Sequence, residues 1–94
     1  MDVHVRFHGA LAQRADGPNR IEVALEDHAT LPDLLDVVAE RLPRVGRSIR
    51  DETGTVRPHV HLFVDGEPAR GEAALARPLH PGAEVLVLPA VSGG

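Results

Sequence analysis

The sequence lacks cysteine and is poor in aromatic residues, and each shortage excludes a class of function. Without cysteine, neither a disulfide framework nor a thiolate metal site can form. The chain also has no thiol of its own to act as a nucleophile or to hold a persulfide. With two phenylalanines and neither tryptophan nor tyrosine, its core must be built from valine, leucine, isoleucine and alanine.

The charge pattern argues against nucleic-acid binding, and the distribution of apolar residues argues against a membrane span. The formal net charge is -4, and no basic stripe with interleaved aromatic residues is present. No apolar run reaches the length of a membrane span, and the first residues show no signal-peptide pattern. The 94 residues predict one cytoplasmic domain that binds neither nucleic acids nor membranes.

Several segments have the patterns of β-strands. Residues 1–8, 20–26 and 59–64 alternate between two faces, as half-buried strands do, and Phe63 lies opposite the apolar face of its strand. Residues 84–88 include a continuous apolar run that is typical of a central strand. Residues 67–70 form a short strand, which Pro68 restricts to a sheet edge.

One amphipathic helix is predicted from Leu31 to Leu42. Thr30 is a favourable N-cap, Asp33 occupies the third helical position of an approximate capping box, and Pro43 ends the helix. Residues 44–58 follow as a long polar stretch, interpreted as a solvated surface loop attached to the body by Ile49 and Val56. Residues 73–79 are a short connection, and Asp65-Gly66 is a tight-turn signal.

This order of elements predicts an α+β domain in which one main helix covers one face of a four- to five-stranded mixed sheet. The other face stays open, so Phe63 is expected to be exposed. Either Val85 and Val87 or Leu86 and Leu88 lie beside it, because only one pair can face the helix. Such an apolar patch is typical of a partner site. The alternative is that residues 44–58 cover the patch.

The last residues run from the apolar strand into two glycines. We expect a β-domain over residues 1–88 and a flexible tail over residues 89–94, which spans roughly 20 Å when extended. Pro89 cannot donate to a sheet, and Gly93 and Gly94 have no Cβ, so a narrow active site can close around them. The alternative is a frayed end without function.

Three stretches carry a resemblance to a known family. Residues 3–7, residues 63–67 and residues 88–94, together with the order of elements, resemble the ubiquitin-like β-grasp fold and the MoaD/ThiS family of bacterial sulfur carriers. The terminal heptad is the specific part of this resemblance, and the rest is generic for the fold.

The resemblance implies a protein cosubstrate and not an enzyme, with no catalytic residue and no bound cofactor of its own. An E1-like partner uses ATP and magnesium to adenylate the Gly94 carboxylate, which then becomes a thiocarboxylate and donates sulfur to a biosynthetic enzyme. The expected partner interface, which comes from the apolar patch and not from the resemblance, is Phe63, Leu86 and Leu88. The tail that enters the partner is Pro89, Ala90, Val91, Ser92 and Gly93.

The acceptor pathway and the type of function have alternatives. Residues 44–58 and Ala90 resemble carriers for cysteine synthesis, in which the thiocarboxylate attacks an aminoacrylate on a pyridoxal-phosphate enzyme. Molybdopterin and thiamin pathways are the other acceptors. A second function is a ubiquitin-like modifier joined to lysines through Gly94. A third is a non-covalent adaptor that uses Phe63 and the last strand.

Paired histidines are the remaining candidates for a site. His59 and His61 share a strand face, as do His4 and His8. Neither pair has an acidic or thiol ligand spaced to close a metal site, so they are interpreted as surface histidines.

Overall fold

The computed structural model describes residues 1–9, 11–12 and 19–89 of the chain. It contains a five-stranded sheet, two helices that follow each other directly and a third short helix near the sheet edge. The elements are β1 (Asp2–Phe7), β2 (Arg20–Ala24), α2 (Leu31–Arg41), α3 (Pro43–Ile49), β3 (Val60–Val64), β4 (Glu67–Pro68), α4 (Gly71–Ala76) and β5 (Glu84–Pro89).

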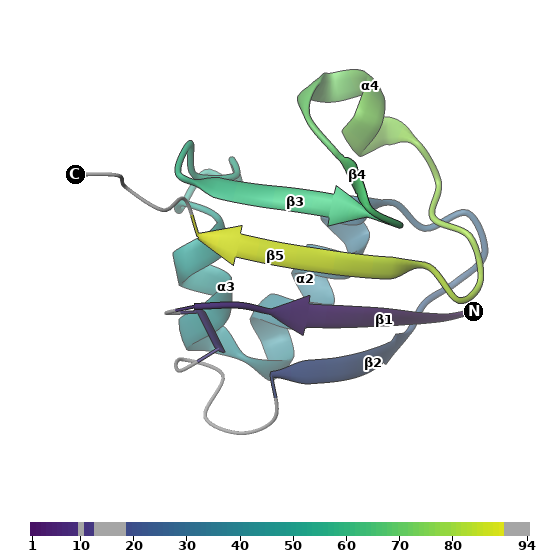
Figure 1. Cartoon of the computed structure of the whole chain (residues 1–94), viewed down its shortest axis with the longest axis horizontal. Coiled ribbons are helices and arrows are strands. Elements are labelled where there is room, and N and C mark those ends of the chain that lie inside the picture. Colours follow the sequence, from purple (N-terminus) through teal and green to yellow (C-terminus); the bar gives the residue numbers. More distant parts are fainter. Residues whose placement is uncertain (10, 13–18, 90–94) are drawn as a thin grey trace.

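The sheet is mixed, with strand order β2-β1-β5-β3-β4. β1 and β5 are parallel neighbours, and all other neighbouring pairs are antiparallel. Figure 1 shows α2 and α3 behind one face of the sheet, while the face toward the viewer carries no helix. The predicted mixed sheet with its main helix on one face is therefore confirmed.

Alternation along the strands separates the core from the open face. Val3, Val5 and Phe7 of β1 are at most 1% exposed. In β5, Val85 and Val87 are also buried, so they are the pair that faces the helices. Because side chains alternate along a strand, Leu86 and Leu88 point to the open face.

α2 forms for the reasons visible in the sequence. The Asp33 carboxylate accepts hydrogen bonds from the Thr30 backbone N–H at 2.9 Å and from Thr30 Oγ1 at 3.1 Å. The helix ends at Arg41, one residue before the predicted end. Its buried residues share one stripe facing the sheet: Leu31, Leu34, Leu35 and Val38.

The prediction of a loop over residues 44–58 is wrong for its first part, because α3 occupies it. Pro43 does end α2, but it also occupies the first turn of α3, where its missing N–H costs nothing. Val45 and Ile49, one turn apart, are buried. Gly46 lies so close to α2 that an added Cβ would be 2.7 Å from Ala39 Cα. Tertiary packing therefore holds this short helix in place.

The remainder of the predicted loop is not featureless either. Arg50 and Val56 form an isolated antiparallel bridge, and the Asp51 carboxylate accepts hydrogen bonds from the backbone N–H groups of Thr53 (2.9 Å) and Thr55 (3.1 Å). The predicted attachment is confirmed, since Ile49 is buried and Val56 packs against the core.

The connection predicted at residues 73–79 is also wrong in part, because α4 covers Gly71–Ala76. No residue of α4 is fully buried, and Leu75 is partly buried against the core. Leu79, just beyond the helix, is buried. No helix in the described part of the chain is long and apolar enough to cross a membrane.

The predicted Asp65-Gly66 turn is present and is linked to the start of β5. Both residues have positive φ, as a two-residue hairpin turn requires. Asp65 Oδ1 accepts the Glu84 N–H at 3.0 Å, and Asp65 Oδ2 contacts His80 Nε2. These contacts lower the pKa of the Asp65 carboxyl. The same carboxylate raises the pKa of His80, because it favours the imidazolium.

Replacing Gly46 by alanine tests the close packing of α3 on α2. We expect Gly46→Ala to lower the free energy of unfolding by about 1–3 kcal/mol, since its Cβ would lie 2.8 Å from that of Ala39. Urea denaturation measures the change. Arg44→Ala, on the exposed side of the same helix, is the control and should alter stability by less than about 0.5 kcal/mol. Equal stability of Gly46→Ala and the native chain would contradict the packing.

The Asp65–His80 contact predicts a pH dependence of stability. The raised pKa of His80 means that its contribution is complete below the unfolded value of about 6.5 and is lost as pH rises through the folded pKa. Asp65, whose pKa is lowered, contributes above about 3.9. The melting temperature of the native chain should therefore exceed that of Asp65→Asn. The difference should be largest at about pH 5–6, between the two unfolded pKa values, and smallest at about pH 9.

Asparagine is the matched replacement at position 65, because it tolerates positive φ and keeps an acceptor for the Glu84 N–H. His80→Gln should remove the same pH-dependent part of the difference. Both side chains are substantially exposed, so added salt should reduce the effect. A difference in melting temperature that is constant from acid to alkaline pH would exclude this contact as its cause.

Candidate functional site

The open face carries an apolar patch made of Phe63, Leu86 and Leu88. Phe63 lies opposite Leu86 in the register of β3 and β5, and His61 lies opposite Leu88. All three patch residues are half-buried on the face away from the helices. No residue between 44 and 58 lines the hollow around Phe63 and Leu86. Thr55 and Val56 line a second hollow together with Phe63, so the alternative in which that segment covers the patch holds only beside Phe63.

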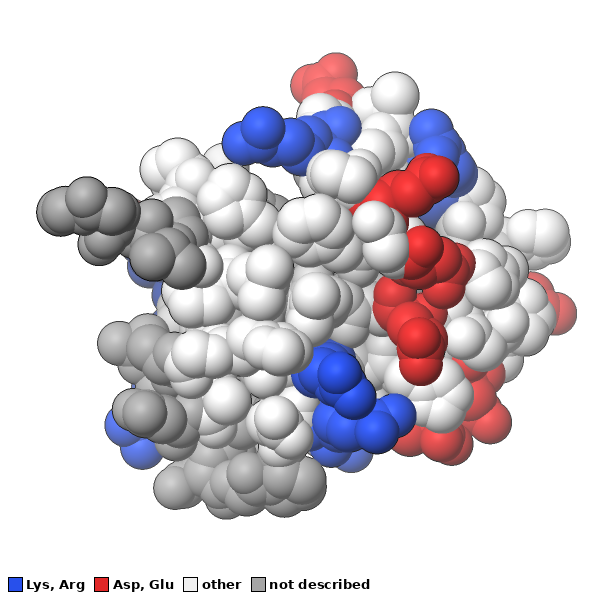
Figure 2. Space-filling view, viewed as in Figure 1, with Lys and Arg blue, Asp and Glu red and all other residues white. Residues whose placement is uncertain are grey.

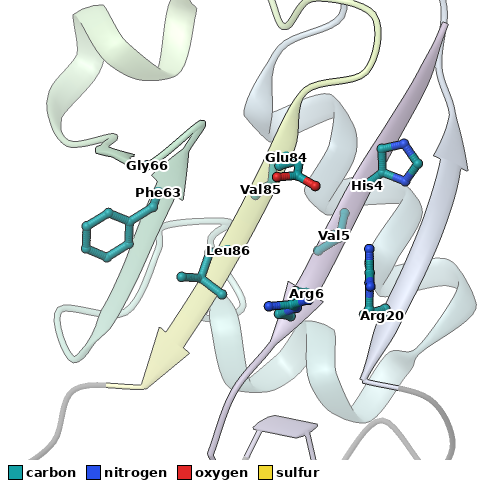
Figure 3. A pocket seen from close by; sticks show the side chains of 9 residues that line it. All are labelled: His4, Val5, Arg6, Arg20, Phe63, Gly66, Glu84, Val85 and Leu86. Atoms are coloured by element: carbon teal, nitrogen blue, oxygen red, sulfur yellow. The ribbon is translucent and has the colours of Figure 1, made fainter.

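Two arginines continue the same row of side chains across the sheet. Leu86 lies beside Arg6 in the parallel register, and Arg6 lies opposite Arg20 in β2. Figure 3 shows Phe63, Leu86, Arg6 and Arg20 projecting from four adjacent strands. Both arginines are exposed, and neither guanidinium has a hydrogen bond or ion pair with another described residue.

The next row along the strands carries opposite charge. Glu84 lies beside His4, and His4 lies opposite Glu22. The nearest atoms of this last pair, His4 Nδ1 and Glu22 Oε2, are 3.6 Å apart. In Figure 2, uncharged surface over β5 and β3 is bordered by basic side chains on one side and acidic ones on another. This pattern fixes the orientation in which a complementary surface can dock.

The rows enclose an open hollow of about 300 Å³. Its described lining contains no nucleophile paired with a base. The lining residues are His4, Val5, Arg6, Arg20, Phe63, Gly66, Glu84, Val85 and Leu86. Within the described residues, no group of three or more histidine, cysteine, aspartate or glutamate side chains is placed to hold a metal ion.

The start of the tail is fixed in the sheet. Pro89 is the last residue of β5 and is paired with Val60, so the strand extends one residue beyond the expected Leu88. The Val60 N–H donates to the Arg57 carbonyl at 3.0 Å and not to Pro89. A Cβ on Gly9 would lie 3.1 Å from Pro89 Cγ, so the turn after β1 packs closely against the ring.

Ala90, Val91, Ser92, Gly93 and Gly94 lie outside the described residues, so their expected roles in threading and modification stay predictions. The structure adds residues that the sequence interpretation did not assign to the site: Arg6, Arg20 and Glu84. The alternation in residues 1–8 already placed Arg6 on the polar face. What was missing was the order of strands, which brings Arg6 beside Leu86.

Comparisons with known proteins agree with this architecture. The ThiS family profile matches residues 5–94. Small archaeal modifier protein 3 of Haloferax volcanii is 34% identical over 95 residues, with all of both chains covered.

Solved structures with the same fold include the crystal structure of SAMP1 from Haloferax volcanii. It has a TM-score of 0.88 and 24% identity, with all of both chains covered. A chain of the Amycolatopsis orientalis BexX/CysO complex has a TM-score of 0.76 and 24% identity, covering 98% of this chain and 99% of that one. The fold is thus the ubiquitin-like β-grasp, and the chain belongs to the ThiS family of small sulfur carriers and protein modifiers.

Proposed function

We propose that this protein is a sulfur carrier whose Gly94 carboxylate is activated by an E1-like enzyme. The observation that carries the proposal is the family match, which extends through residue 94 and so includes the Gly-Gly end. The absence of cysteine supports it, because the sulfur must then be held on a group other than a thiol side chain.

The chemistry proceeds in two steps at Gly94, first an adenylyl transfer to the carboxylate and then an acyl transfer to sulfur. A carboxylate is a poor electrophile, so its oxygen first attacks the α-phosphate of ATP, with magnesium on the partner, and pyrophosphate leaves. Hydrosulfide, or a donor equivalent to it, then attacks the acyl carbon of the adenylate and AMP leaves. The product is a thiocarboxylate, whose soft sulfur is delivered without release of free sulfide.

The open face supplies the binding that these steps need. The apolar patch provides the buried contact, and Arg6 and Arg20 beside it provide pairing for carboxylates of the activating enzyme. Because Pro89 is held in the sheet, docking of this face sets where the tail begins. The BexX/CysO complex, which contains a chain of the same fold, supports assembly of such carriers with a second protein.

The acceptor favoured by the sequence is a pyridoxal-phosphate enzyme of cysteine synthesis. There the thiocarboxylate sulfur would attack an enzyme-bound aminoacrylate and form a carbon–sulfur bond. Hydrolysis of the resulting thioester, or an acyl shift followed by cleavage, would return the Gly94 carboxylate. Residues 44–58 and Ala90 support this choice, and molybdopterin and thiamin-type acceptors are the competing ones.

A second candidate is a ubiquitin-like modifier joined to other proteins through Gly94. The 34% identity to small archaeal modifier protein 3 favours it. Activation begins with the same adenylate, but a lysine amine attacks in place of sulfur. This chain contains no lysine, since all ten of its basic Lys or Arg residues are arginine. A diglycine remnant on lysine would therefore always identify a different protein.

Mass spectrometry of the intact protein tests whether a thiocarboxylate forms at Gly94. Incubation with the E1-like enzyme of the same genome, ATP, magnesium and a sulfide donor should raise the mass by about 16 Da, as one oxygen is replaced by sulfur. The chain without Gly93 and Gly94 is the control and should keep its mass. An unchanged mass of the full chain, with enzyme that activates another substrate, would contradict the sulfur-carrier proposal. Diglycine-modified lysines without a thiocarboxylate would favour the modifier.

Truncating the apolar patch should weaken docking without unfolding the protein. We expect Phe63→Ala to raise the KM for the carrier about tenfold or more, since aromatic anchors dominate such contacts. The readout is the rate of adenylation at varied carrier concentration. Glu67→Ala, exposed on the adjacent hairpin strand, is the control and should change KM by less than about twofold. Equal KM values for Phe63→Ala and the native chain would exclude Phe63 from the interface.

A further inference from the structure

A strongly basic surface lies outside the open face, against α3. An open hollow of about 430 Å³ there has three guanidinium groups and one imidazole in its lining, and no carboxylate. The lining residues, called the basic hollow below, are Arg44, Arg47, Ser48, Arg57 and His59. Such a concentration of positive charge is unexpected on a chain whose net charge is -4.

The helix and the segment before β3 build the basic hollow together. Arg44, Arg47 and Ser48 are spaced three and four residues apart, so they share one face of α3, while Val45 and Ile49 face the core. The Arg57 Nε donates to the Arg47 carbonyl at 3.0 Å, which fixes that guanidinium against the helix. The two terminal nitrogens of Arg57 make no hydrogen bond or ion pair with another described residue.

Three carboxylates lie near α3, but none of them lines the basic hollow. Asp36 pairs with Arg50 at 2.9 Å, away from the lining. The pKa of the Asp51 carboxyl is lowered mainly by the hydrogen bond from the Thr53 hydroxyl, with smaller contributions from the Thr53 and Thr55 N–H groups and from Arg57. Asp51 lines a neighbouring hollow, which Arg47 and Arg57 also line. Like charges three residues apart on a helix repel each other, so the arrangement costs stability unless an anion binds.

The basic hollow borders the start of the tail. His59 directly precedes Val60, which is paired with Pro89 at the end of β5. Figure 1 shows α3 beneath the end of the sheet where β5 ends. Gly94 is the fifth residue after Pro89, and an extended chain of that length reaches about 17 Å. A protein that encloses Gly94 therefore has to place its surface close to these arginines.

We propose that the basic hollow docks an acidic protein surface, rich in aspartate and glutamate, beside the channel of the enzyme that receives Gly94. The inference rests on the proposed function for the identity of that partner. Arginine forks match carboxylates with two parallel hydrogen bonds, and arginine is the residue type used here at every basic position. A nucleic-acid partner is disfavoured, because no phenylalanine, tyrosine or tryptophan lines the basic hollow.

Charge reversal on α3 tests this surface in the activation assay. The double variant Arg44→Glu/Arg47→Glu should raise the KM for the carrier at least about tenfold at about 50 mM salt, with kcat unchanged at saturation. At about 300 mM salt, screening should bring the two KM values to within about threefold. Arg44→Lys/Arg47→Lys should recover most of the loss. Arg70→Glu/Arg77→Glu, exposed around α4, is the control for net charge.

A second measurement tests anion binding to the basic hollow in the absence of any enzyme. Titration of the native chain with an octaglutamate peptide, followed by NMR of the arginine Nε–H groups, should shift Arg44, Arg47 and Arg57 and leave Arg70 unmoved. If activation fails but these shifts occur, the proposed function fails and the anionic site stands.

Three results would overturn the inference. The first is a native KM in the Arg44→Glu/Arg47→Glu chain, and the second is an equal loss in the Arg70→Glu/Arg77→Glu control. The third is preference for a single-stranded oligonucleotide over octaglutamate at the same arginines, which would replace the protein partner by a nucleic acid.

Discussion

The position of β5 between β1 and β3 is the constraint on which the rest of the structure depends. A strand at the end of the chain usually lies at a sheet edge or frays, but here it is paired on both sides. Its alternate residues serve two surfaces, with Val85 and Val87 in the core and Leu86 and Leu88 on the open face. A slip of one residue would exchange the two sets, so core packing fixes which side chains a partner meets.

This arrangement also explains why the tail begins at a defined place. Pro89 is held by its pairing with Val60 and by its close approach to Gly9, so the point of departure is set by two neighbouring strands. The apolar patch lies on one side of that point and the basic hollow on the other. Two chemically different surfaces thus lie near the residue at which the described chain ends, and the proposed function assigns a partner contact to each.

Local signals in the sequence were sufficient for part of the fold. Thr30, Asp33 and the apolar spacing predicted α2, and Asp65-Gly66 predicted the turn after β3. α3 was missed because Pro43 ends one helix and begins the next, and because its stability comes from burial of Val45 and Ile49. Both facts depend on packing against α2, which no local pattern shows. α4 was missed because no side chain of that helix is fully buried, so its sequence carries little periodicity.

The candidate site likewise has a part that local sequence predicts and a part that depends on the three-dimensional arrangement. Alternation placed Phe63 on the open face, but the neighbours of Leu86 depend on strand order, so Arg6 and Arg20 could not be assigned from sequence. Arg57 and His59 meet α3 only in three dimensions. The role of Gly94 stays a prediction, and ATP–pyrophosphate exchange by the E1-like enzyme tests it most directly. Exchange is expected with the free Gly94 carboxylate and none when that carboxylate is amidated, whereas equal exchange with both forms would contradict activation at Gly94.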